Sequence, residues 1–470
     1  MIDRVVQKSF LLWQAEALAE KAADPDPRVE DPAEDASVAP EELEEVRREL
    51  AAAVARERAE PMTPVPENPE DDERRGEEPE PIEERSYFPR DAVLSLAQAA
   101  IERYLREHRQ DLLVPLTGNG DDRRGDDEVV SAGPDVSLRL PDEAIPGDEE
   151  DDRRLGGAFE ITDPGWVSSL IAMGWRRFRH RRPFKDEPAP VATLADNARV
   201  VVVGDWASGT ERARNVAAQM AVKVEEAGAA GRECHVVHLG DTYYAGWDFE
   251  YEQRFLPWWP VKRGEPHGSW SLNGNHDMYA GGRGYFDLLL ADERFSAQAG
   301  SSWFSLENDH WQLLGLDTAY TDHAFTGDQP RWIADKVAAN PERKTMLLSH
   351  HQLFSAFGHG GPKLEKAIHA VLESDRIDAW LWGHEHRCVV YEPQQHVRFA
   401  RCIGHGGVPV YAHHGSREGV RWYLEKSFQQ GLEEWALQGF AVLDFDGPRI
   451  TVDYFDEFGG PDFVGVDTIE

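Results

Sequence analysis

The chain has 470 residues and carries 87 acidic against 50 basic side chains, a formal net charge of −37 at pH 7. Such acidity argues against a general nucleic-acid binder and against binding to anionic membranes, because both kinds of surface would repel the chain. The N-terminus lacks the apolar core of a secretory signal, and no run of about 18 apolar residues could span a bilayer. Three cysteines, Cys234, Cys388 and Cys402, match no zinc, redox or disulfide pattern. We therefore expect a cytoplasmic protein without stable membrane insertion.

The first 190 residues are the most acidic part of the chain, with 47 acidic and 26 basic side chains. Segments such as "PENPEDDERRGEEPEPIEER" bury too little apolar surface to offset the entropy of ordering, so we expect residues 1–160 to be mostly disordered. Apolar residues at helical spacing predict short helices over residues 3–22, 41–58 and 91–108. We interpret these as solvated helices, or as sites for a protein partner that binds the acidic region.

A fourth apolar segment, "DPGWVSSLIAMGWRRFRHRRPFK", lies at residues 163–185. Asp163 is a suitable N-cap for a helix, and Pro164 is a suitable first residue. One face of that helix would carry Trp166, Leu170, Ile171 and Trp175. Its basic tail could bind a membrane surface or an acidic partner, or it could pair with the chain's own acidic half. The sequence thus predicts an amphipathic helix and a basic linker over residues 161–190.

Residues 191–470 have the composition of a compact mixed α/β domain. Apolar runs followed by polar residues predict its strands, among them "ARVVVVGD", "CHVVHLGD", "SWSLNGNHD", "KTMLLSHH" and "DAWLWGHEH". Stretches with helical spacing, such as "DQPRWIADKVAAN", lie between them. Near the C-terminus, "GFAVLDFDGPRITVDYFDEFG" predicts a hairpin that turns at Asp446-Gly447. The expected fold class is α/β, with parallel and antiparallel strands.

Five of the predicted strands end in aspartate, asparagine or histidine. These side chains are Asp205 in "GDWASG", Asp241 in "GDTYY", Asn275, His276 and Asp277 in "GNHD", His350 and His351 in "SHH", and His384 and His386 in "GHEH". In open α/β sheets, ligands gather at the carboxyl ends of strands. Imidazole nitrogen and carboxylate oxygen bind hard and borderline metal ions. Together the five endings predict a metal centre.

The order of these motifs resembles that of the calcineurin-like metallophosphoesterases, whose pattern is D-x-H, G-D, G-N-H-[DE], a later H and G-H-x-H. The resemblance covers roughly residues 198–456 and implies a mixed β-sandwich flanked by helices. The family's first motif has a histidine two residues after the aspartate, where this chain has Ala207. The G-D-x-x-Y spacing of "GDTYY" is similar to the purple acid phosphatase branch, in which that tyrosine binds a metal. The resemblance therefore implies that Tyr244 is a ligand and that Tyr243 packs.

The same resemblance implies two metal ions about 3.5–4 Å apart. The first would bind Asp205, Asp241, Tyr244 and His386, and the second would bind Asp241, Asn275, His350 and His384, with Asp241 bridging. A tyrosinate adds a hard anion to the first site. This addition favours Fe(III) there, with Fe(II), Zn(II) or Mn(II) at the second site.

The function implied by the resemblance is hydrolysis of small phosphate esters through attack of a metal-bound hydroxide on phosphorus. His276, oriented by Asp277, would protonate the leaving group, because imidazole titrates near neutral pH. Plant purple acid phosphatases carry histidines at an offset similar to that of His359 from His350, which implies a substrate contact. We expect a phosphomonoesterase. The alternatives are a phosphodiesterase acting on small nucleotides, and a binding or scaffold protein on a degenerate phosphoesterase fold.

Two further histidines have separate interpretations. His351 follows a predicted ligand on a strand and would point the other way, so we expect a structural role. His405 in "CIGHGG" lies in a glycine-rich turn, and is either close to the metals or a simple loop residue.

Overall fold

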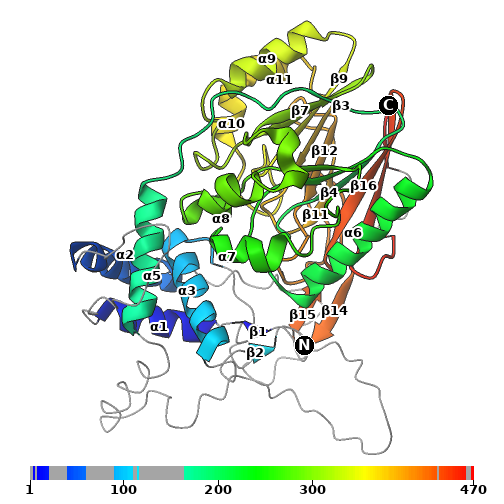
Figure 1. Ribbon diagram of the computed structural model, residues 1–470. Coiled ribbons are helices and arrows are strands. Elements are labelled where there is room, and N and C mark those ends of the chain that lie inside the picture. Colours follow the sequence, from blue (N-terminus) through cyan, green and yellow to red (C-terminus); the bar gives the residue numbers. More distant parts are fainter. Residues whose placement is uncertain are drawn as a thin grey trace, which may run out of the picture. The chain divides into compact units, whose positions relative to one another are not determined.

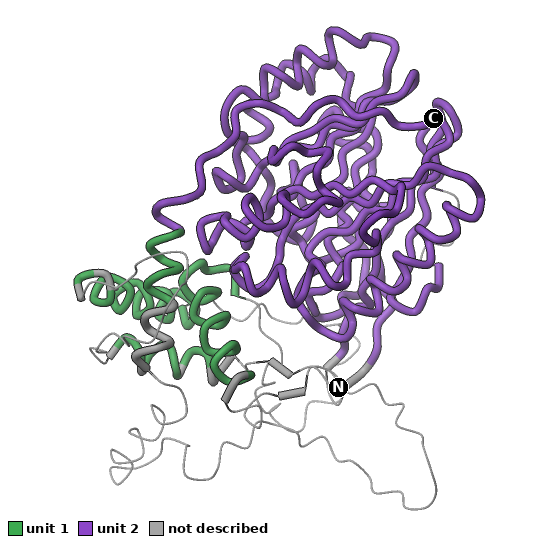
Figure 2. Tube along the Cα trace, viewed as in Figure 1, with its two compact units in different colours: residues 1–177, 430–433 green, residues 178–429, 434–470 purple. Residues whose placement is uncertain are grey.

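The computed structural model describes residues 4–5, 8–20, 40–59, 89–108, 114–115, 164–430, 433–461 and 467–470. The chain divides into two compact units (Figure 2), residues 1–177 with 430–433 and residues 178–429 with 434–470. Among the helices of the described residues, none combines the length and the apolar character that a membrane span needs. The expectation of disorder between the helices of residues 1–160 falls outside the described residues.

The first unit consists mainly of helices (Figure 1). Its elements are α1 (Lys8–Glu20), α2 (Pro40–Ala59), α3 (Ala92–His108), most of α5 (Pro164–Arg179), and the antiparallel strands β1 (Arg4–Val5) and β2 (Val114–Pro115). Helix α1 packs on α2, and both contact α3. Leu11, Ile101 and Ile171 are fully buried, and the indole N–H of Trp175 donates to Oε1 of Glu45 at 3.3 Å.

The four predicted helices are therefore present. The apolar residues of α1, α2 and α3 are buried and these three helices contact one another, which corrects the interpretation of those three segments as solvated helices. Each leucine or isoleucine buried in this way contributes about 1.5–3 kcal/mol relative to exposure. The helices of the first unit thus stabilise one another.

The second unit is built on two mixed β-sheets (Figure 1). An eight-stranded sheet has the order β13-β11-β12-β10-β9-β8-β7-β3, and a six-stranded sheet has the order β18-β17-β16-β4-β5-β6. The strands of the eight-stranded sheet are β3 (Ala192–Thr193), β7 (Phe304–Glu307), β8 (Trp311–Leu316), β9 (Lys344–Ser349), β10 (Ala379–Trp382), β11 (Cys388–Tyr391), β12 (Phe399–Ile403) and β13 (Val420–Tyr423). Those of the six-stranded sheet are β4 (Arg199–Val203), β5 (Cys234–His238), β6 (Gly268–Ser271), β16 (Gly439–Asp446), β17 (Arg449–Asp456) and β18 (Asp467–Ile469). A separate pair is formed by β14 (Ser427–Gln430) and β15 (Glu433–Ala436).

The two sheets pack face to face because both faces of their central strands are apolar. Val200 and Val202 of β4 share a buried cluster with Leu348 of β9 in the other sheet. Val201, between them on the strand, points to the opposite face and packs with residues of α6 (Glu211–Ala229). The predicted hairpin is confirmed as β16–β17.

Helices cover the outer face of each sheet. Helix α6 lies on the six-stranded sheet, and residues of α9 (Gln329–Ala339) and α11 (His369–Glu373) lie over the eight-stranded sheet. Helix α10 (Pro362–Ala367) contacts α11. The connections contain short helical turns, namely α7 (Asp248–Glu250), η5 (Tyr251–Phe255), α8 (Asn275–Tyr279), η6 (Gly284–Leu289) and η7 (Glu293–Gln298). The unit is a β-sandwich between helices, so the predicted α/β fold class is confirmed.

Residues 178–190, expected to be part of a basic linker, lie along the second unit. The ring of Phe184 stacks on that of Trp303 with centroids 6.4 Å apart. The backbone N–H of Ala189 donates to the carbonyl of Trp303 at 2.8 Å, and the indole N–H of Trp303 donates to the carbonyl of Lys185 at 3.0 Å. This segment therefore belongs to the packed unit.

A chain that begins at residue 178 should be more stable than one that begins at residue 191. Both chains keep every candidate metal ligand, but the shorter one loses the two hydrogen bonds to Trp303 and the packing of Phe184. At about 1 kcal/mol for each of these three contributions, the loss is about 3 kcal/mol. We expect a fall in Tm of about 5 °C or more. Thermal unfolding of both chains measures it, and equal Tm values would contradict the assignment of residues 178–190 to this unit.

Candidate metal centre

Parallel strands bring the candidate ligands to one edge of the two sheets. Strands β4, β5 and β6 are parallel neighbours, and β8, β9, β10 and β12 form a second parallel set. The residues that follow the carboxyl ends of β4, β5, β6, β9 and β10 are Asp205, Asp241, Asn275, His350 and His384. Side chains at such strand ends converge. The backbone N–H of His384, for example, donates to Oδ2 of Asp205 at 2.7 Å.

The backbone is unusual at four of the candidate ligands. The angle φ is 54° at Asp205, 74° at Asp241, 69° at His384 and 54° at His386. Residues other than glycine rarely adopt positive φ, and such strain gathers at functional sites. The Asp241 side chain approaches the backbone of Gly274 in "GNHD" so closely that only glycine fits there, because a Cβ would lie 2.0 Å from Oδ1 of Asp241.

The first group of donor atoms surrounds the hydroxyl of Tyr243. This oxygen lies 2.9 Å from Oδ1 of Asp205, 3.0 Å from Oδ2 of Asp241 and 2.9 Å from Nε2 of His386. All four side chains belong to buried residues.

The second group of donor atoms surrounds Nε2 of His350. This nitrogen lies 3.1 Å from Oδ1 of Asn275, 3.2 Å from Nδ1 of His384 and 3.3 Å from Oδ2 of Asp241. The other ring nitrogen of His350, Nδ1, lies 3.0 Å from the carbonyl oxygen of Leu239. This hydrogen bond orients the ring so that Nε2 faces the group.

Both groups have the spacing of ligands around a single ion. Donors held at about 2.1 Å from a six-coordinate ion, at right angles to one another, lie about 3.0 Å apart. The distances above fit this value, and Oδ2 of Asp241 belongs to both groups, as a bridging carboxylate would. Carboxylate, phenol, amide and imidazole donors suit first-row transition metals. We call the two groups together the inner metal centre.

Comparison with known families agrees with this geometry. Residues 198–388 match the model of the calcineurin-like phosphoesterase family. This segment is a calcineurin-like phosphoesterase domain. No curated protein sequence matches the chain.

Solved structures with some similarity include phosphatases. GAP50, the anchor in the inner membrane complex of Plasmodium, is 13% identical over 58% of this chain and 89% of its own, with a TM-score of 0.43. A dimetal phosphatase from Danio rerio is 14% identical over 60% of this chain and 99% of its own, with a TM-score of 0.37. A cold-active protein-tyrosine phosphatase of a Shewanella species is 14% identical over 61% of this chain and 84% of its own, with a TM-score of 0.28. Similarities at this level carry no inference about the substrate of the phosphoesterase domain.

The buried charges of the inner metal centre shift one another's pKa values. Burial, together with the neighbouring Asp241, raises the pKa of Asp205 to about 8. Burial also disfavours the ionised form of Asp241, but His350 and His276 outweigh it and hold the pKa of Asp241 below its usual value. Burial alone would lower the pKa of His350. The Asp241 carboxylate has the larger opposite effect, and the pKa of His350 is raised to about 9. A cation bound to these side chains would therefore displace protons from them.

The phenol of the inner metal centre is that of Tyr243. Its backbone N–H donates to the carbonyl of Ala207 at 3.2 Å, and Ala207 pairs with Thr242. The backbone of Tyr243 thus lies beside Ala207, at the position where the phosphoesterase family has the histidine that this chain lacks. Tyr244 instead lies against Arg254, whose guanidinium carbon is 5.1 Å from the Tyr244 ring centroid. The hydroxyl that lies among the donor atoms is that of Tyr243, the residue predicted to pack, and the role of Tyr244 as a metal ligand stays a prediction.

His276 is held by the backbone. Its Nδ1 lies 2.6 Å from the carbonyl oxygen of Tyr244, and its ring centroid lies 4.5 Å from that of Tyr243. These contacts place the imidazole beside the first donor group, so it stays a candidate for proton transfer.

Asp277 anchors the loops that carry the ligands. Its carboxylate accepts the hydroxyl of Tyr251 and the backbone N–H groups of Asp241 (2.8 Å), Thr242 (3.0 Å) and Gly274 (2.6 Å). The expectation that Asp277 orients the His276 ring is corrected, because the carboxylate bonds to these backbone groups and the Tyr244 carbonyl holds the ring.

The remaining predicted histidines have different outcomes. His359 lies in an exposed loop, where its carbonyl accepts from the side chain of Gln352 at 2.7 Å, and its contact with substrate stays a prediction. His405 is buried, and neither of its ring nitrogens has a hydrogen-bond partner among the described residues. His351 does not point away from the site, because its ring centroid lies 4.8 Å from that of His350 and 4.7 Å from that of His384.

Sequence reasoning missed His323, whose ring centroid lies 3.8 Å from that of His351. His323 ends the stretch "GLDTAYTDH", which begins in β8. This is a sixth apolar strand followed by polar residues, and the rule that found the other five would have pointed to Asp317 directly after it, with His323 further along the same loop.

Proposed function

We propose that the chain hydrolyses phosphate esters of small molecules at a two-metal centre. The observation that carries this proposal is the position of Asp241, whose Oδ2 lies in both donor groups. Two ions bound there would lower the pKa of a water molecule and offset the charge that develops on the phosphoryl oxygens. A scaffold protein would have no need of two complete donor groups, which argues against a purely structural role.

The chain's own residues hold the ions and supply the proton. The first ion would be held by Asp205, Asp241, Tyr243 and His386, and the second by Asp241, Asn275, His350 and His384. Because the Nδ1 of His276 is engaged with the Tyr244 carbonyl, Nε2 is the nitrogen that would donate a proton to the leaving alkoxide. Asp277 would act as a positioning residue through the backbone of Asp241.

Within this class we favour a phosphomonoesterase of the purple acid phosphatase type. Tyr243, ionised by the metal, adds a third anionic donor to Asp205 and Asp241, which favours a trivalent ion such as Fe(III) at the first site. The second site, with two imidazoles and an amide, suits Fe(II), Zn(II) or Mn(II). A phosphomonoester carries more negative charge than a diester, so a more highly charged metal pair favours it.

Two model substrates test this proposal. The metal-loaded protein is assayed with para-nitrophenyl phosphate and with bis(para-nitrophenyl) phosphate, before and after removal of the metals by a chelator. We expect release of nitrophenol to depend on metal and kcat/KM to be higher for the monoester. A higher kcat/KM for the bis ester would identify a phosphodiesterase. Turnover of neither substrate by protein that holds two ions would contradict a hydrolytic role.

A further inference from the structure

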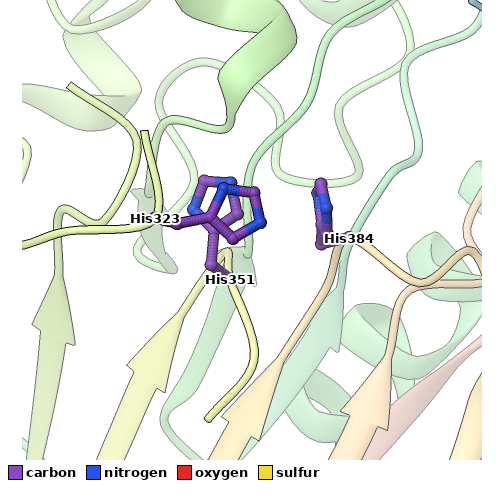
Figure 3. Close-up of side chains that lie close together, drawn as sticks. All are labelled: His323, His351 and His384. Carbon is purple, nitrogen blue, oxygen red and sulfur yellow. The ribbon is translucent and has the colours of Figure 1, made fainter. Parts of the chain in front are cut away.

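Three histidines lie close together (Figure 3), and one of them, His384, also belongs to the inner metal centre. His323 lies in the loop after β8, His351 follows β9 and His384 follows β10. One ring nitrogen from each lies within 4.8 Å of the others. His351 and His384 are buried, whereas the side chain of His323 is 31% exposed. We call these three residues the outer histidine cluster.

Neighbouring polar groups hold two of the three rings. Nδ1 of His351 lies 3.1 Å from the hydroxyl of Thr318, and Nδ1 of His323 lies 3.0 Å from Oδ1 of Asp322. Metal-binding histidines commonly use one ring nitrogen for such a partner and the other for the ion. Asp322 also lies 3.3 Å from Nε2 of His351, so one carboxylate faces both rings.

The Nε2 of His351 is buried, and its charged neighbour is the Asp322 carboxylate at 3.3 Å. His351 is 0% exposed, and its Nε2 makes no hydrogen bond within the part of the chain that the structure describes. A contact of 3.3 Å is longer than a good hydrogen bond, so this nitrogen is only weakly satisfied. Three imidazoles and a carboxylate meet at this place, which is a donor set suited to a metal ion.

We propose that the outer histidine cluster binds a third divalent cation of the zinc class, distinct from the two ions of the inner metal centre. Zinc binds imidazole nitrogen at about 2.0–2.1 Å, so tetrahedral ligands lie about 3.4 Å apart. The nitrogens must therefore approach one another by up to about 1.4 Å from their present limit of 4.8 Å. The partly exposed loop of His323 can supply this movement.

His384 belongs to both centres. Its Nδ1 faces the second donor group, 3.2 Å from Nε2 of His350, and the ring has a second nitrogen on its opposite side. Bound through both nitrogens, this ring would be an imidazolate, with its N–H proton released to solvent when the second ion binds. The outer ion would add two positive charges near the mouth of the inner centre. In a chain of net charge −37, such a local charge would attract anionic substrates.

Metal stoichiometry tests this proposal independently of hydrolysis. The full chain is stripped with a chelator and equilibrated by dialysis with Zn²⁺, and the bound metal is measured by mass spectrometry. We expect about three ions per chain for the wild type and about two for His323→Ala and for His351→Ala. Asp241→Ala should lose inner ions but keep the outer one.

His396→Ala is the matched control, since His396 is an exposed histidine that pairs with a carboxylate, at 2.9 Å from Asp375. It should retain three ions. Two ions in the wild type, unchanged in His323→Ala, would overturn the proposal, and so would an equal loss in His396→Ala. Loss of every ion in His323→Ala, with an unchanged circular dichroism spectrum, would show that the cluster is part of the inner centre and would also overturn it.

Discussion

Asp241→Ala should abolish hydrolysis of para-nitrophenyl phosphate, with a fall in kcat/KM of at least about 10³-fold. Oδ2 of Asp241 lies 3.0 Å from the Tyr243 hydroxyl and 3.3 Å from Nε2 of His350, so the substitution removes one donor from each group. Stabilisation of transition-state charge by such ions is worth several kcal/mol, and each 1.36 kcal/mol corresponds to tenfold in rate. Activity and bound inner metal should therefore be lost together.

Asp309→Ala is the control for this experiment. Asp309 is exposed in the turn between β7 and β8, and therefore lies at the opposite end of β8 from the strand ends that carry the ligands. This variant should keep the activity and metal content of the wild type. The assignment of Asp241 as a bridging ligand would be wrong if Asp241→Ala retained both ions and near wild-type kcat/KM.

The strand ends explain why most of the inner metal centre could be predicted. A polar residue directly after a buried parallel strand has its position set by the sheet. Asp205, Asp241 and His350 are therefore close in space for the same reason that they are recognisable in sequence. The two-sheet fold follows likewise from the apolar runs, since strands that are buried on both faces must be covered on both faces.

The tyrosine could not be assigned in this way. Tyr243 and Tyr244 lie in a loop, where spacing in the sequence does not fix direction. Their orientation depends on the carboxylate of Glu250, which accepts the backbone N–H groups of Tyr244 and Ala245, and on the bond from the Tyr243 N–H to Ala207. None of these contacts has a signature in the sequence.

Packing of the N-terminal helices was also beyond sequence reasoning. Helical periodicity located α1, α2, α3 and α5, but the acidic segments around the first three suggested that those three were solvated or bound a partner. An apolar stripe does not reveal what covers it. The bond between Trp175 and Glu45 joins residues 130 positions apart, a separation at which composition gives no information.

Tyr243→Phe should remove the colour of the iron-loaded protein. Burial, together with Asp205 and Asp241, raises the pKa of Tyr243 well above 10, so the phenol ionises only when a cation replaces its proton. A phenolate bound to Fe(III) gives a visible charge-transfer band. Phenylalanine keeps the ring but removes the oxygen, so the band should disappear and iron should bind at least about tenfold more weakly. Visible absorption and iron titration measure both effects.

Tyr244→Phe is the matched control, because it removes the same atom from the adjacent residue. Its ring lies against Arg254, so colour and iron affinity should be unchanged. Loss of colour in Tyr244→Phe, with colour retained in Tyr243→Phe, would restore Tyr244 as the ligand and contradict the orientation of this loop. Colourless wild-type protein that binds iron would exclude a ferric phenolate. In that case, the hydroxyl of Tyr243 would serve as a hydrogen-bond donor to Asp205 and Asp241, next to two divalent ions.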